Sequence, residues 1–71
     1  MENNRLKASH AGWALNAYRN RVAPNDQMNG QLAQDLLADL MHWCDMHGES
    51  FDDLLSRASD HYGFEKLNHE K

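Results

Sequence analysis

The feature that most constrains this chain is a sharply marked break, Gly48-Glu49-Ser50, between two amphipathic segments that together run from Leu32 to Tyr62. Glycine suits the left-handed position that closes a helix, and serine suits the N-cap that opens the next one. Two aspartates follow within the first turn after Ser50, where negative charge complements the helix dipole. The sequence therefore predicts a helical hairpin that turns at residues 48–50.

The segment before this break, about residues 29–47, has an unusually wide apolar arc. One stripe comprises Leu32, Leu36, Leu40, Trp43 and His47, and its neighbour comprises Ala33, Leu37, Met41 and Cys44. Together the two stripes cover about half of the helix circumference, since each residue advances by about 100°. One neighbouring helix would bury only part of such an arc. We therefore expect a central helix whose remaining apolar side chains are buried by self-association or by a partner. Three residues could cap its start: Asn25, Asp26 and Asn29.

Two further helices are expected, at about residues 6–23 and 51–62. The first should end before Pro24, because proline disfavours helical geometry at the residue before it. Its main apolar stripe comprises Ala8, Ala11, Leu15, Tyr18 and Val22, and a second stripe on the opposite side comprises Leu6, His10, Trp13 and Ala17. The last helix has an apolar face made of Phe51, Leu54, Leu55, Ala58 and Tyr62. We expect Gly63 to end it and residues 64–71 to form a polar tail.

Length and composition limit the class of protein. Seventy-one residues form one domain with a small core, and a single cysteine excludes an intramolecular disulfide. There is no apolar run near the roughly 20 residues that span a bilayer, and the start of the chain does not resemble a signal peptide. We expect a cytoplasmic protein that is not bound to a membrane.

Charge is distributed unevenly along the chain. Residues 1–24 carry four basic side chains against one acid, whereas residues 25–71 carry three basic side chains against ten acids. One interpretation is that the basic first helix complements the acidic hairpin, either in its own chain or in a second copy. The alternative is an acidic face that binds a basic partner.

Neither a metal site nor a catalytic site emerges from the polar residues. Cys44 and His47 are possible zinc ligands, but His42 projects about 200° away from Cys44, and a structural zinc site needs four ligands. Asp35, Asp39 and His42 share one face and could hold magnesium, as in an all-helical nucleotide pyrophosphohydrolase. The chain lacks the paired acidic motifs on facing helices of such enzymes. We expect no enzyme activity, metal or cofactor, and a metal-dependent helical nucleotide hydrolase stays as an alternative.

The hairpin also permits a helix-turn-helix regulator as an alternative. The candidate recognition helix carries three acidic side chains, Asp52, Asp53 and Asp60, and one basic side chain, Arg57. DNA binding normally needs several basic side chains on the docking surface. We therefore expect binding to protein rather than to nucleic acid. The candidate residues for binding a partner or a second copy are Leu6, His10, Trp13, Tyr18, Asp35, Asp39, Trp43, Asp52 and Asp53.

Residues 35–62 carry the pattern Asp-Leu-Leu-x-Asp-Leu-x-His, a glycine turn, and a closing Ala-x-x-His-Tyr. This pattern resembles a group of small helical proteins of bacteriophages and other mobile elements, most of them uncharacterised. The resemblance implies a phage or plasmid context and assigns no activity or site. Small acidic proteins of such elements often bind host proteins, including defence proteins. Our expectation is an all-α, three-helix domain, completed by homo-oligomerisation, that binds and modulates a host protein.

Overall fold

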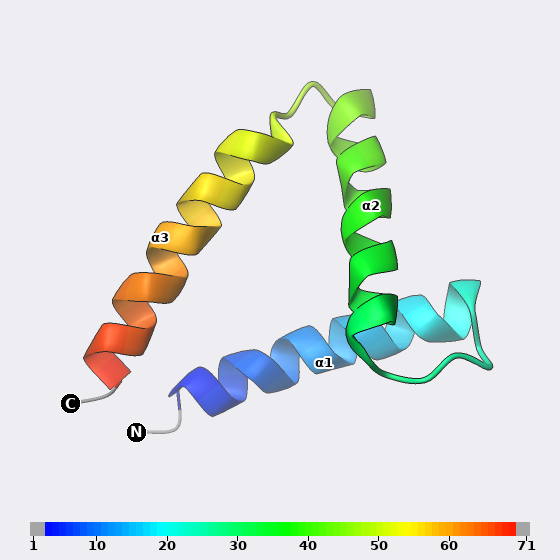
Figure 1. Cartoon of the computed structure of the whole chain (residues 1–71), viewed down its shortest axis with the longest axis horizontal. Coiled ribbons are helices and arrows are strands. Elements are labelled where there is room, and N and C mark those ends of the chain that lie inside the picture. The colour runs from blue at the N-terminus through cyan, green and yellow to red at the C-terminus, as the bar shows by residue number, and fades with distance from the viewer. Residues whose placement is uncertain (1–2, 70–71) are drawn as a thin grey trace.

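The computed structural model of this protein describes residues 3–69, which form three α-helices and no strand. They are α1 (Asn3–Val22), α2 (Gly30–Met46) and α3 (Phe51–His69). The three helices lie like the sides of a triangle, and the C-terminal end of α3 returns towards the N-terminal end of α1 (Figure 1). The prediction of an all-α arrangement of three helices is confirmed.

The predicted turn at residues 48–50 between α2 and α3 is also confirmed, and its caps follow from local sequence. Gly48 has a φ of 69°, and the N–H of Glu49 donates to the carbonyl oxygen of Cys44 at 2.9 Å, which satisfies an end carbonyl of α2. Ser50 opens α3, because its hydroxyl oxygen accepts the N–H of Asp53 at 3.2 Å.

The start of α2 is set by one of the three candidate caps. The side-chain oxygen of Asn29 accepts the N–H of Leu32 at 3.1 Å, and Asn29 itself has extended backbone geometry. Asp26 instead belongs to the preceding turn, where its N–H donates to the carbonyl oxygen of Ala23 at 2.9 Å. Asn29 is therefore the N-cap of α2.

The predicted end of the last helix at Gly63 is wrong. α3 continues through Gly63 to His69, and Gly48 is the only described glycine with a positive φ. A glycine inside a helix costs only about 1 kcal/mol, and contacts with α1 hold the extension in place. The Glu65 carboxylate forms an ion pair with Lys7 at 3.3 Å. The backbone carbonyl oxygen of Glu65 accepts a hydrogen bond from the side-chain amide of Asn4 at 3.4 Å. Residues 70 and 71 of the expected tail lie outside the described residues.

Very little of the described chain is buried. Leu32 and Cys44 are its only buried apolar residues, at 1% and 0% exposure, and they lie near opposite ends of α2. The radius of gyration is 13.9 Å, whereas a compact chain of this length would have about 11 Å. The molecule is only 16 Å thick along its shortest axis. The three helices thus form a flat frame whose packing is concentrated at the corners.

Candidate protein-binding surfaces

Half-exposed apolar side chains form a first candidate surface along α2 and α3. It is named here the α2–α3 apolar surface and comprises Leu37, Leu40, Met41, Trp43, Leu55 and Tyr62. These side chains share their arcs with the residues that pack at the corners: Leu32 and Cys44 on α2, and the partly buried Phe51 and Leu54 on α3. The surface is therefore a continuation of the small core that no helix of the described chain covers.

A second candidate surface lies on the back of α1. It is named the α1 stripe and comprises Leu6, His10, Trp13 and Ala17, all of them exposed. Trp13 is 67% exposed, and the ring of His10 packs against it with 5.1 Å between centroids. Leu15 and Tyr18, on the other side of α1, are partly buried. The predicted second stripe of this helix therefore faces away from the packed side.

Tyr18 and Asp39 join α1 to α2. The Tyr18 hydroxyl donates to a carboxylate oxygen of Asp39 at 2.6 Å. This hydrogen bond, together with desolvation and the negative charges of Asp39 and Asp35, raises the pKa of Tyr18 to about 12. Two of the predicted binding residues are thus engaged with each other, and the exposed Asp35 lies close enough to raise the pKa of Tyr18.

The remaining predicted residues lie towards the corner between α2 and α3. Trp43 is half-exposed and stacks on His47, with 4.4 Å between ring centroids, and His47 Nδ1 lies 2.9 Å from the carbonyl oxygen of Trp43. Asp52 and Asp53 are exposed in the first turn of α3. The nine predicted residues therefore occupy separate places on the frame rather than one continuous surface.

The predicted binding residues do not include several exposed apolar side chains. Phe64 and Leu67 are largely exposed on the last turns of α3, and Met46 is exposed at the end of α2. Phe64 and Leu67 were left out because the helix was expected to end at Gly63, although their spacing of three residues is typical of a helix. Met46 follows Trp43 at the same spacing.

The polar residues do not converge on a metal site in the described part of the chain, where no group of three or more His, Cys, Asp or Glu side chains could hold an ion. Burial raises the pKa of the Cys44 thiol, and the charges of Glu49 and Asp45 raise it further, which favours the neutral thiol over the thiolate ligand that zinc requires. Glu49 and Asp52 stand at a Glu-x-x-Asp spacing, but Glu49 lies in the turn rather than on a helix.

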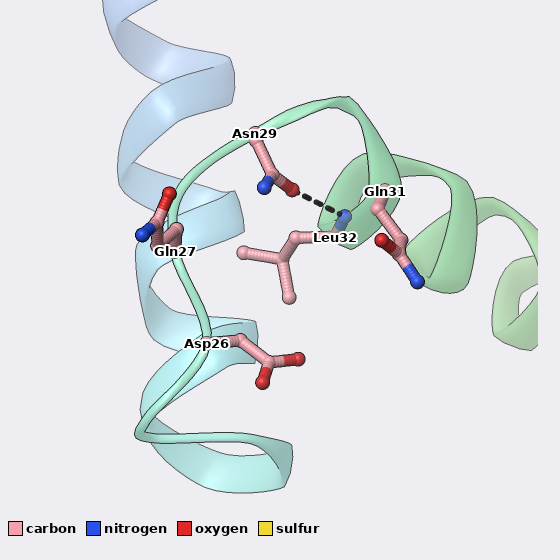
Figure 2. A pocket seen from close by; sticks show the side chains of 5 residues that line it. All are labelled: Asp26, Gln27, Asn29, Gln31 and Leu32. Carbon is pink, nitrogen blue, oxygen red and sulfur yellow. Dashed lines mark hydrogen bonds between the residues drawn. The ribbon is translucent and has the colours of Figure 1, made fainter.

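A small pocket lies where the loop before α2 curls around Leu32 (Figure 2). Its volume is about 160 Å³, and its lining consists of Asp26, Gln27, Asn29, Gln31 and Leu32. The Asn29 side chain is already used by the helix cap, and Leu32 belongs to the packed corner. The pocket is therefore a consequence of how the loop enters α2.

None of the three helices, over the residues described, is both long enough and apolar enough to cross a membrane. Comparison with known proteins gives no matching family model, no similar curated protein and no similar solved structure. Arguments about function therefore depend on the two apolar surfaces and on the charges around them.

Proposed function

We propose that this chain is a non-catalytic binding protein that attaches to another protein through the α1 stripe. The observation that carries this proposal is the 67% exposure of Trp13 on the side of α1 that faces away from the packed corners. Tryptophan is among the residues most enriched at binding hot spots. The stripe also has the spacing with which one helix face fills a groove on a partner, namely steps of four, three and four residues from Leu6 to Ala17.

The charge of α1 indicates what kind of groove would fit. The helix contains four basic side chains, Arg5, Lys7, Arg19 and Arg21, and no acidic one. An apolar groove bordered by acidic side chains would complement it, because opposite charges at the rim of an interface favour association and select the correct partner.

The class of partner follows from the resemblance of residues 35–62 to proteins of bacteriophages and other mobile elements. Proteins of such elements act inside the bacterial host, and the small acidic ones often bind host proteins. We therefore place the target among host proteins, with defence proteins as the first group to examine.

The test is a pull-down from bacterial host lysate with the wild type, Trp13→Ala and Met46→Ala. Met46 is an even more exposed apolar residue, on another helix, and serves as the matched control. We expect at least one host protein to be recovered by the wild type and by Met46→Ala, and lost with Trp13→Ala.

A titration with the purified partner then gives the affinity. Truncating a hot-spot tryptophan costs about 2 kcal/mol or more, so we expect a Kd at least about 30-fold weaker for Trp13→Ala. Circular dichroism should show unchanged helix content, because Trp13 is largely exposed and its ring packs on His10 of the same helix. Equal recovery by the wild type and Trp13→Ala would contradict the proposal.

A further inference from the structure

We infer that the α2–α3 apolar surface binds a second copy of this chain, in a two-fold dimer that leaves the α1 stripe free. This inference concerns a different surface from the proposed function and does not depend on it. It rests on the accessible area of the frame, on the position of its exposed apolar side chains, and on its charges.

The accessible area of the chain is too large for a self-sufficient monomer. It amounts to 6039 Å², whereas a folded monomer of 8.2 kDa would expose about 4500 Å². The excess is about 1500 Å² per chain, and a standard interface buries about 800 Å² on each partner, with homodimers often burying more. One copy of similar size is therefore enough to cover the excess.

Of the thirteen large apolar side chains that are exposed in the described chain, six belong to the α2–α3 apolar surface, and three of these lie close together on α2. Leu37, Leu40 and Met41 lie on adjacent turns in the middle of α2, at 48%, 40% and 48% exposure. They sit between the two buried residues of the same helix, Leu32 and Cys44. The uncovered patch is thus flanked by packed corners, and its centre carries no charged side chain, as the core of a homodimer interface requires.

Charge complementarity favours a second copy over an unrelated protein. α1 has a net charge of +4, whereas α2 contains three aspartates and no basic residue, and α3 has four acids against two bases. In a two-fold dimer each contact occurs twice, so the basic α1 of each copy can approach the acidic rim of α2 in the other. Opposite charges already pair α1 with α3 within the chain, through Lys7 and Glu65.

The test measures molar mass by light scattering during size-exclusion chromatography, and by sedimentation from low to high micromolar concentration. We expect the wild type to have twice the 8.2 kDa mass of the chain at the higher concentrations. Leu40→Glu should be monomeric at every concentration, because it places a charge at the centre of the uncovered patch. The matched control Leu6→Glu, on the α1 stripe, should remain dimeric.

Helix content by circular dichroism must accompany these masses. Leu40 is 40% exposed, so Leu40→Glu should have the same helix content as the wild-type monomer. If Leu40→Glu loses helix content, Leu37→Gln is tested instead. Leu37 is more exposed than Leu40, and glutamine adds no charge. That variant should weaken the dimer at least about 10-fold while α2 stays helical.

A spectroscopic readout reports on the surface itself. Trp13→Phe leaves Trp43 as the only tryptophan, and Trp43 belongs to the α2–α3 apolar surface. Its emission should shift to shorter wavelengths as the concentration rises through the dimer transition, and Leu40→Glu should abolish the shift. A wild-type chain that stays at 8.2 kDa, or a dimer that Leu6→Glu disrupts and Leu40→Glu spares, would overturn the inference.

The two proposals fail independently. The molar mass of Leu40→Glu tests only the α2–α3 apolar surface. The recovery of a host protein by Trp13→Ala tests only the α1 stripe. A monomer that still recovers a host protein through Trp13 would refute the dimer and support the proposed function.

Discussion

Apolar side chains near the ends of α2 and several of those in its middle differ in burial. Leu32 and Cys44, towards the ends, are 1% and 0% exposed, while Leu37 and Met41, between them on the same apolar arc, are each 48% exposed. All four residues belong to the apolar arc, so membership of the arc does not decide which of them are covered. The positions at which the neighbouring helices meet α2 decide it.

The geometry of the frame explains this difference. A helix of 17 residues is about 25 Å long, and a helix that crosses it steeply is only about 10 Å wide. α1 crosses α2 towards its start and α3 meets it at its end (Figure 1), so the side of the middle that carries Leu37, Leu40 and Met41 stays exposed, although Asp39 in the same stretch bonds Tyr18 of α1. Local caps at Asn29, Gly48 and Ser50 fix the corners. Comparisons between the corners and the middle test this account.

The largest expected effect is that of Leu32→Ala, compared with Leu37→Ala. Removing a buried leucine typically costs about 2–5 kcal/mol, which is a large part of the stability of a small domain. Leu37 is half-exposed, so its truncation should cost less than about 1 kcal/mol when the protein is dilute enough to be monomeric. Urea unfolding followed by circular dichroism gives both values. Equal losses would show that the middle of α2 is covered within the chain.

A second pair compares the glycine of the hairpin corner with the glycine inside α3. Gly48→Ala places a Cβ at a φ of 69°, which should reduce stability by about 1–2 kcal/mol. Gly63 has helical geometry and open space around a Cβ, so Gly63→Ala should increase stability by about 0.5–1 kcal/mol. Thermal unfolding should therefore show shifts of opposite sign. A stability loss in Gly63→Ala would mean that α3 ends at Gly63 after all.

A smaller effect is expected at the start of α3. Ser50→Ala removes the oxygen that accepts the Asp53 N–H and should cost about 1 kcal/mol. Ser56→Ala, at an exposed position inside the same helix, should be neutral or slightly stabilising, since alanine favours helix interiors. The free energies of unfolding of both variants should be measured by urea titration. Indistinguishable values would argue against the corner being fixed by its cap.

The smallest effect concerns pH at the contact between α1 and α2. The pKa of Tyr18 in the folded chain is about 12 against an ordinary value of 10.0, so the folded state holds this proton more tightly. The resulting stability is fully present below about pH 10 and is lost as the pH rises through 12.

The titration is measured by tyrosinate absorbance, as the difference between the wild type and Tyr18→Phe. We expect a midpoint near 12 in the wild type and a lower one in Asp39→Asn, because this change removes the negative charge that opposes ionisation. A Tyr18 midpoint that Asp39→Asn leaves unchanged would show that the hydrogen bond between α1 and α2 does not form in solution.

Local sequence determined the helices and the turn at residues 48–50, because caps and helical periodicity depend on residues within one or two turns. It also indicated that the apolar arc of α2 is wider than the hairpin can cover. It did not determine where α3 ends, since the contacts of Asn4 and Lys7 with Glu65 join residues about 60 positions apart.

Tertiary structure alone decided which side of α1 faces solvent and which part of α2 is buried. Both sides of α1 carry apolar stripes, and the bond between Tyr18 and Asp39 identifies the packed one, which leaves Trp13 on the outside. Leu32 and Leu37 both belong to the wide apolar arc of α2, but they project about 140° apart around the helix, and where α1 and α3 cross it leaves only Leu37 exposed. Periodicity shows which residues of a helix can be buried, whereas the angles and positions at which helices cross determine which of them are.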